Sequence, residues 1–352
     1  MASNKKTIWA SIDPGKYALK YAGLDEERGI MKGSMRSKYS PDSLRNNYFG
    51  RGTIIAQIDN GNTYRLGNGG LNEPDAVTSK KSEIHRIDTM AGIAMMCDRN
   101  AFNIVNAVLT IPQSLINNVD LKNEYIQYIL GTPEEEHTVW LKTSPEEEPY
   151  CVRFAVNKRY VYPEGDGIIY EHADLFNGMT GIIDIGGHNA NGKISRGIDD
   201  DIERFSFTAE LGGKIMVDGL ADYLSARLNI RVVPELVEDI IKKPYKERYV
   251  ETQMGKEFDE RIAKESSALI REYMLGHVKK IWQYCNKNAW PWETIKLVFV
   301  GGTSSVLPYE LGQIFGKNIN IPNHPEMSNA LGNLYRMCAN NNIDLGKFGA
   351  AQ

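Results

Sequence analysis

The sequence contains few of the residues that build metal sites and disulfide-stabilised scaffolds. Only 4 cysteines occur among 352 residues, and no two of them form a C-x-x-C pair. The 6 histidines are equally dispersed, so no spacing typical of a zinc site is present. Scattered cysteines are typical of a cytosolic protein with reduced thiols, and they exclude a small disulfide scaffold.

Long apolar runs and an excess of charge of one sign are also absent. The first mostly apolar run, Ile8 to Ile12, is too short for a signal peptide, and no run approaches the length that spans a bilayer. The 41 basic and 45 acidic residues give a net charge of −4, which disfavours direct binding to nucleic acid. We therefore expect a cytoplasmic protein with no membrane partner and no direct nucleic-acid contact.

The length and the order of predicted elements indicate an α/β protein of about two domains. A strand, an Asp-x-Gly turn and a second strand occur twice, around Asp13 and around Asp184, which lie close to half the chain apart. This pattern indicates a weak internal duplication. We expect each half to contain a sheet with one Asp-bearing hairpin, and the two turns to face each other across a cleft.

Periodicity and turn residues predict the remaining elements. The acidic runs at 134–136 and 146–148 are expected to be solvated loops. A short helix is expected to end near 177, and a helix and a short strand are expected between 303 and 322. Further strands are predicted over 53–58, 103–111, 151–162 and 295–300, and helices over 85–99, 114–130, 213–228, 258–281 and 327–339.

The first hairpin contains a candidate phosphate-binding turn. Glycine in a tight turn allows backbone N–H groups to approach a phosphate, and Gly15 follows Asp13-Pro14. Lys20 on the outgoing strand adds a positive charge to such a site. The alternative is a plain hairpin with a surface lysine.

The second hairpin contains a candidate magnesium-binding carboxylate. Asp184 ends a buried strand beside Gly186 and Gly187, which suits coordination of Mg²⁺ through water and contact with phosphate. The alternative is an aspartate that caps a turn. Residues 187–193 fit most of a Walker A pattern, but Ile194 stands where Ser or Thr holds magnesium. Because a strand rather than a helix is predicted there, we reject a P-loop.

Two further segments follow predicted strands. In Pro163-Glu164-Gly165 the carboxylate lies at a strand end, where it is suited to orient an attacking water. Gly301-Gly302-Thr303 lies between a strand and a helix, where glycines allow a nucleotide base or sugar to lie on the backbone. The alternatives are an exposed loop glutamate and an ordinary loop.

The order of these pieces, together with Ser328 to Gly332 in a late helix, resembles the actin, sugar-kinase and heat-shock-chaperone ATPase superfamily. Within it, the chain resembles the bacterial actin-like proteins of the ParM type, which segregate plasmids. That closer resemblance rests on Val161 to Gly165, on Pro325 to Gly332 and on the compact size. The resemblance extends from Ile8 to about Met337.

The resemblance implies an actin-like fold with two duplicated mixed-sheet domains around a nucleotide cleft. Residues 1–178 and 325–352 would form one domain and 179–324 the other. ATP or GTP would bind with Mg²⁺, which Asp13 and Asp184 would hold through water, while Glu164 would position the hydrolytic water. The phosphates would contact Asp13, Gly15, Lys16, Lys20, Gly186, Gly187, His188 and Asn189, and the adenosine would contact Gly301, Gly302 and Thr303.

Three of these residues depart from the superfamily pattern. Lys16 stands where Ser or Thr is usual, and His188 and Asn189 replace residues that are often hydroxylic or basic. The preference for ATP or GTP therefore stays open.

The resemblance implies a filament-forming ATPase or GTPase that segregates plasmid DNA. Its partners would be a DNA-binding adaptor protein and other copies of itself in the filament. The alternative is a sugar or acyl kinase of the same superfamily, which would need a pocket and a base for the acceptor hydroxyl. A chaperone-like ATPase is disfavoured, because it should have a separate substrate-binding domain beyond the last helix. A membrane-attached relative should have a terminal amphipathic helix, which neither end of the sequence offers.

Overall fold

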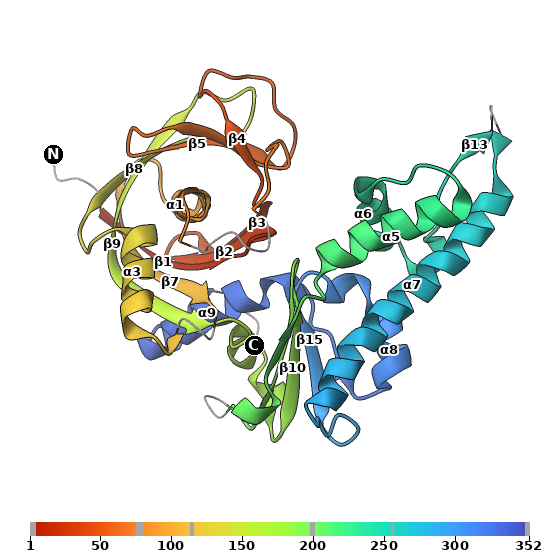
Figure 1. Cartoon of the computed structure of the whole chain (residues 1–352). Coiled ribbons are helices and arrows are strands. Elements are labelled where there is room, and N and C mark those ends of the chain that lie inside the picture. Colours follow the sequence, from red (N-terminus) through yellow and green to blue (C-terminus); the bar gives the residue numbers. More distant parts are fainter. Residues whose placement is uncertain (1–4, 75–80, 113–115, 198–200, 255–256, 349–352) are drawn as a thin grey trace. The chain divides into compact units, whose positions relative to one another are not determined.

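The computed structural model describes residues 5–74, 81–112, 116–197, 201–254 and 257–348. The chain divides into two compact units, each of which is described by itself (Figure 1). Unit 1 consists of Met1–Ala173 and Met327–Gln352, and unit 2 consists of Asp174–Glu326. No helix in the described part of the chain is long and apolar enough to cross a membrane.

Unit 1 is built on a mixed sheet, for which the described residues supply nine strands in the order β3-β2-β1-β7-β9-β8-β5-β6-β4. β1 pairs with β2 in antiparallel and with β7 in parallel orientation, and β7 is also parallel to β9. The strands are β1 (Lys5–Pro14), β2 (Ala18–Asp25), β3 (Gly29–Arg36), β4 (Tyr39–Pro41), β5 (Thr53–Ile58), β6 (Thr63–Gly67), β7 (Phe102–Ile111), β8 (Glu136–Lys142) and β9 (Tyr150–Pro163).

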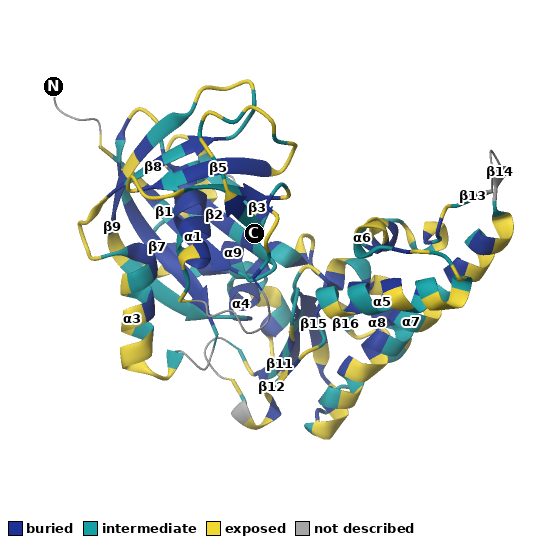
Figure 2. Ribbon diagram, turned by 45° about the horizontal axis from the view of Figure 1, so that its top comes forward, coloured by how far each residue is buried: buried dark blue, intermediate teal, exposed yellow. Residues whose placement is uncertain are grey.

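Helices cover both faces of this sheet. Its strands curve around α1 (Glu83–Met96), which is almost entirely buried (Figures 1 and 2). Alternate residues of β1, such as Ile8 and Ile12, belong to the same apolar cluster as this helix. On the other face, α9 (Ser328–Asn340) packs against Leu24 and Val108. The period of two along the strands thus supplies one apolar surface for each helix layer. The other helices of unit 1 are α3 (Val119–Leu130) and α4 (Gly167–Glu171).

Unit 2 has a smaller mixed sheet in the order β12-β11-β10-β15-β16. β10 pairs with β11 in antiparallel and with β15 in parallel orientation, which repeats the arrangement of β1, β2 and β7. The strands are β10 (Thr180–Ile185), β11 (Ala190–Ser195), β12 (Phe207–Ala209), β15 (Lys296–Val300) and β16 (Ile319–Asn320), with a separate pair β13 (Gln253–Met254) and β14 (Glu257–Phe258). The helices are α5 (Gly213–Leu228), α6 (Pro234–Lys242), α7 (Glu260–Lys287) and α8 (Pro308–Phe315).

Short 3₁₀ turns connect these elements. They are η1 (Ala173–Phe176), η2 (Glu203–Phe205), η3 (Tyr245–Glu247), η4 (Ser304–Val306), η5 (Pro325–Met327) and η6 (Leu345–Phe348). The mixed α/β class with an Asp-bearing hairpin in each half is therefore confirmed.

The cysteine thiols are free and mostly buried. Cys97, Cys285 and Cys338 are buried and Cys151 is half-buried. Burial raises the pKa of the Cys285 and Cys338 thiols to about 12, so both stay protonated at neutral pH. These thiols act as small apolar side chains in the core.

Candidate functional site

Three neighbouring parallel strands of unit 1 end at the same edge of the sheet. β1, β7 and β9 run in the same direction, with Ile12 opposite Leu109 and Ile111 opposite Pro163. Asp13 lies at the end of β1, and Glu164 follows the end of β9 two strands away. Strand spacing therefore places the two segments about 10 Å apart, on either side of the end of β7.

The first turn has a backbone that only glycine fits. A Cβ on Gly15 would lie 2.6 Å from the carbonyl oxygen of Ala18. The Gly15 carbonyl accepts a hydrogen bond from the Ser37 hydroxyl at 2.7 Å, which ties the turn to the segment after β3. Lys16 lies half-buried in this turn. The turn is thus a tight, anchored loop, as the sequence predicted.

Asp13 and Lys20 form an ion pair across the base of this turn. The two residues are opposite each other in the hairpin register, and their side chains meet at 3.3 Å. Asp13 is buried and Lys20 is half-buried. A cation beside a glycine turn at a sheet edge provides the positive charge that a phosphate group requires.

Glu164 lies in a turn that is held in place by hydrogen bonds from two backbone N–H groups. Its N–H donates to the carbonyl of Ile111 at the end of β7, at 2.9 Å. The next residue, Gly165, has a φ of +84°, which favours glycine, and its N–H donates to Oδ1 of Asn329 at 2.9 Å. Glu164 is half-buried, so its carboxylate is neither a core group nor a fully solvated one.

Tyr125 is a polar residue beside this edge that the sequence did not reveal. It lies on α3 and is 2% exposed, and its hydroxyl has no hydrogen-bond partner in the described part of the chain. Burial raises the pKa of Tyr125, and the carboxylates of Glu164 and Asp13 raise it further. The phenol therefore stays protonated as a donor close to both carboxylates. In the sequence it is one more apolar-face residue of a helix.

The predicted residues of the second hairpin gather at the end of β10. Asp184 is half-buried, and the Gly186 N–H donates to the carbonyl of Asn189 at 2.9 Å, which closes the turn over Gly187 and His188. The strand β11 contains the end of the Walker-like segment and the two residues after it. The rejection of a P-loop is therefore confirmed, because no helix begins there.

The start of α5 fixes this turn, a role that the sequence did not reveal. The N–H groups of Gly212, Gly213 and Lys214 donate to the carbonyls of His188, Gly186 and Gly187 at 2.9, 2.9 and 2.7 Å. A Cβ on Gly212 would lie 2.3 Å from the backbone of His188. The N-terminal end of a helix dipole thus adjoins the turn, where it favours negative charge. The Gly-Gly pair at the helix start is the signal that could have identified this contact.

The predicted adenosine loop adjoins the same turn. Thr303 donates from its hydroxyl to the Gly186 carbonyl at 2.8 Å and from its N–H to the Ile185 carbonyl at 3.1 Å. Gly301 has a φ of +84°, and a Cβ there would lie 2.4 Å from Oδ1 of Asp184. Gly302 is exposed. The structure therefore brings together all eight residues that were predicted in this half: Asp184, Gly186, Gly187, His188, Asn189, Gly301, Gly302 and Thr303.

The stability of unit 2 is expected to depend on His277, which supports the start of α5. This buried residue of α7 donates from Nε2 to the Leu211 carbonyl at 3.1 Å. Burial lowers its pKa to about 4, and Lys280 contributes to the lowering. Because the folded state disfavours the proton, the stabilisation is complete above pH 6.5 and decreases as the pH falls toward 4.

We expect unit 2 to lose about 2 kcal/mol of unfolding free energy between pH 7 and pH 5. Denaturant melts at both pH values measure this loss, and His277→Gln should reduce it. An equal loss in the His277→Gln variant would contradict this assignment.

The carboxylate beside each glycine turn is of a kind that binds magnesium together with a phosphate. Among the described residues, no group of three or more His, Cys, Asp or Glu side chains is placed to hold a metal. Mg²⁺ usually keeps several waters and binds through one or two carboxylates together with substrate phosphates. Asp13 in unit 1 and Asp184 in unit 2, each beside a glycine turn, are carboxylates of that kind.

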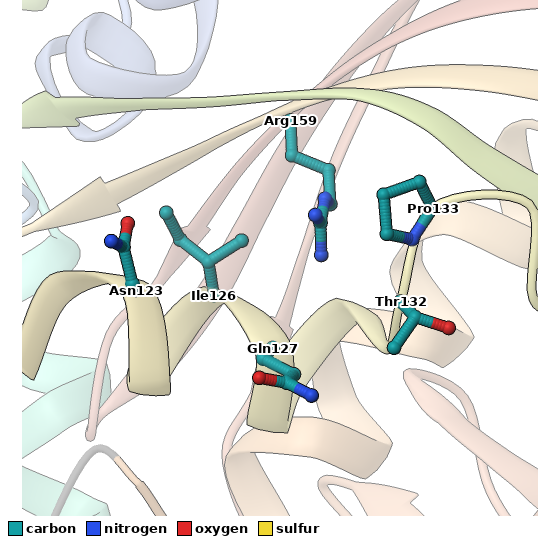
Figure 3. Close-up of a pocket in the computed structure, with 6 residues that line it drawn as sticks. All are labelled: Asn123, Ile126, Gln127, Thr132, Pro133 and Arg159. Atoms are coloured by element: carbon teal, nitrogen blue, oxygen red, sulfur yellow. The ribbon is translucent and has the colours of Figure 1, made fainter. Parts of the chain in front are cut away.

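A separate surface pocket of about 330 Å³ lies between α3 and β9 (Figure 3). Its lining contains none of the predicted site residues. The guanidinium of Arg159 enters the pocket and also donates to the Gly131 carbonyl at 2.6 Å. The lining residues are Asn123, Ile126, Gln127, Thr132, Pro133 and Arg159.

Comparison with solved structures decides the fold. The archaeal actin homolog Ta0583 in complex with ADP matches with a TM-score of 0.69 and 15% identity, over 95% of this chain and 99% of that one. The chain has the actin-like fold. The Alp12 filament structure matches with a TM-score of 0.67 and 22% identity, over 96% and 99% of the two chains. Apo pSK41 ParM matches with 0.66 and 11%, over 96% and 98%.

The actin-like fold extends over nearly the whole chain, although the sequence has diverged widely. No protein-family model and no curated protein matches the sequence. The predicted actin-like architecture is therefore confirmed by structure alone. Within this fold, the Asp-bearing hairpins occupy equivalent positions in the two units, each antiparallel to its partner strand and parallel to the next.

Proposed function

We propose that the chain is a nucleotide-dependent, filament-forming actin-like ATPase that segregates plasmid DNA through a DNA-binding adaptor protein. The observation that carries the proposal is the pair of anchored glycine turns, each beside a strand-end aspartate, in an actin-like fold. Each unit, acting as one actin-like domain, contributes one phosphate-binding turn. The solved relatives support the two main elements, since Ta0583 is recorded with ADP and Alp12 as a filament.

The proposed chemistry is hydrolysis of a nucleoside triphosphate. Lys20 would neutralise phosphate charge at the first turn, and Asp13 and Asp184 would hold Mg²⁺ through water. Mg²⁺ held there would supply positive charge that neutralises the phosphates. Glu164 orients the attacking water, and Gly301, Gly302 and Thr303 hold the adenosine.

Nucleotide binding is proposed to control assembly. Domain closure around a ligand is a common two-state change, and a head-to-tail contact that does not close on itself builds an open filament. The net charge of −4 produces little repulsion against self-association. The adaptor would connect such a filament to DNA, which a chain of this charge does not attract directly.

We expect Mg²⁺ with ATP or GTP to cause reversible polymerisation. Light scattering and sedimentation across protein concentrations should show a critical concentration, and the signal should fall as nucleotide is consumed. The same chain in EDTA is the control. If neither nucleotide gives a pelletable species while a sugar or acyl acceptor becomes phosphorylated, the filament proposal is wrong and the kinase alternative replaces it.

A further inference from the structure

The turn that contains Glu164 is attached to the last long helix of unit 1. The Gly165 N–H donates to Oδ1 of Asn329, the second residue of α9, at 2.9 Å. On the other side of the turn, the Glu164 N–H donates to the Ile111 carbonyl of β7. Glu164 therefore lies between two consecutive peptide groups that are fixed to different elements.

The backbones of α4 and α9 are in direct contact just beyond this turn. A Cβ on Gly332 would lie 1.7 Å from the carbonyl oxygen of Gly167, and a Cβ on Gly167 would lie 2.3 Å from that of Ser328. Neither glycine can be replaced without moving one helix away from the other. The start of α9 is thus held at a fixed position relative to the turn, and the Asn329 side chain extends from it to Gly165.

A second polar contact also joins α9 to the segment that follows Glu164. Arg336, two turns along α9, approaches Asp166 with its guanidinium 3.4 Å from the carboxylate. This ion pair lies after the turn and fixes the beginning of α4. The Asn329 bond is the one that reaches the peptide next to Glu164 itself.

We propose that Asn329 is a positioning residue for Glu164. Its side-chain oxygen holds the Gly165 amide, which sets the direction in which the Glu164 carboxylate points from the turn. The inference rests on the proposed function, since it gives Asn329 a role only where Glu164 orients a hydrolytic water. Glycine is the most freely rotating residue of a chain, so the Asn329 bond restricts the Gly165 backbone that follows Glu164.

We expect Asn329→Ala to reduce kcat for nucleotide hydrolysis by about 10-fold to 100-fold, the usual effect of removing a group that orients a functional residue. The nucleotide dissociation constant and KM should stay close to wild type, because the phosphate and adenosine contacts are intact. Asn329→Asp keeps an oxygen at the same place, and a carboxylate suits the first turn of a helix. It should therefore retain most of the wild-type rate.

Asn340→Ala is the matched control. Asn340 also lies on α9, and its side-chain amide donates to the hydroxyl of Tyr162 in β9 at 3.1 Å. Among the described residues, no hydrogen bond joins Asn340 to residues 164 or 165. Its removal should leave kcat unchanged, while a general loosening of α9 would lower kcat in both variants.

Two further measurements separate positioning from a structural role. In a Glu164→Ala background, Asn329→Ala should cause no additional loss of rate, because residues that act as a unit are not additive. Hydrogen exchange of the peptide that contains Gly165 should become faster in Asn329→Ala and stay slow in Asn340→Ala. Asn329→Ser, whose side chain is shorter and suits a helix start, replaces the alanine variant if that variant melts early.

A wild-type kcat in Asn329→Ala, or a loss that persists in the Glu164→Ala background, would overturn the role of Asn329. A wild-type chain that releases no phosphate overturns the proposed hydrolysis, and the role of Asn329 with it. If the chain hydrolyses nucleotide but does not polymerise, only the filament proposal is wrong. The kcat values of the Asn329 variants then still test the positioning role.

Discussion

Glu164→Ala is expected to slow phosphate release by about 10²-fold to 10⁴-fold, the range for a residue that orients or deprotonates a reacting water. The carboxylate follows the end of β9 and is half-buried in an anchored turn, so the substitution removes the group without disturbing the sheet. Nucleotide affinity should change little, because the glycine turns are intact. Single-turnover phosphate release and an equilibrium nucleotide titration measure the two effects separately.

Glu171→Ala is the matched control for this variant. Glu171 is another half-buried glutamate, at the end of the helix that follows the same turn. It should release phosphate at the wild-type rate. Release at the wild-type rate from the Glu164→Ala variant as well would remove Glu164 from the mechanism.

Asp184→Ala is expected to reduce magnesium-dependent turnover by about 100-fold, the upper range for loss of a group that supports a metal site. The Asp184 carboxylate is in contact with the predicted adenosine loop, because a Cβ on Gly301 would lie only 2.4 Å from Oδ1 of Asp184. Titration of phosphate release with Mg²⁺ should show a weaker apparent affinity. The alternative role, a cap on the turn, predicts a lower melting temperature with unchanged specific activity of the folded fraction.

Asp201→Ala provides the control for charge. Asp201 is an exposed residue whose backbone forms a β-bridge with Ser195 of β11 and whose carboxylate pairs with Lys193 at 2.9 Å. Its loss removes the same charge from a residue that pairs with this hairpin. The Mg²⁺ dependence of this variant should equal that of the wild type.

Local turn chemistry made the two hairpins predictable from the sequence. Pro14-Gly15 and Gly186-Gly187 interrupt apolar runs, and each run has the length of a strand. The structure pairs Asp13 with Lys20 and Asp184 with Asn191 across these hairpins. Predictions of this kind succeed because both strands and the turn lie within about 20 residues.

Helix boundaries were predicted less well. The helix expected over 114–130 begins at Val119, because the Asn118 side chain caps it by accepting a hydrogen bond from the Leu121 N–H at 3.0 Å. Residues 114 and 115 of that prediction lie outside the described part of the chain. The helix expected up to about 177 is two pieces, since α4 ends at Glu171 and a 3₁₀ turn begins at Ala173.

Several strands were missed because their signal depends on distant partners. The acidic run 134–136 was expected to be a loop, but Glu136 begins β8, whose inward residues His137, Val139 and Leu141 are fully buried. A seven-residue strand with polar residues on its other face is weak evidence until β5 and β9 flank it. The described residues form nine strands in the sheet of unit 1 and five in the main sheet of unit 2. The duplication seen in the sequence did not predict this difference in strand number.

Contacts between residues far apart in sequence were the hardest part of the site to predict. The bond between Gly165 and Asn329 joins positions that only the folded chain brings together. The approach of Gly212 to His188 likewise depends on how α5 enters the sheet. Composition and periodicity contain no information about such pairs, whereas the glycines themselves were visible.

Each unit contains at least one buried cysteine whose reaction with a reagent would report the unfolding of that unit. Cys285 is the one cysteine of unit 2, while Cys97 and Cys338 are buried in unit 1. An alkylating reagent cannot modify these thiols until the surrounding core opens, since only an accessible thiolate reacts. Peptide mapping after a timed pulse of reagent would therefore show which half of the molecule opens first, without any introduced label.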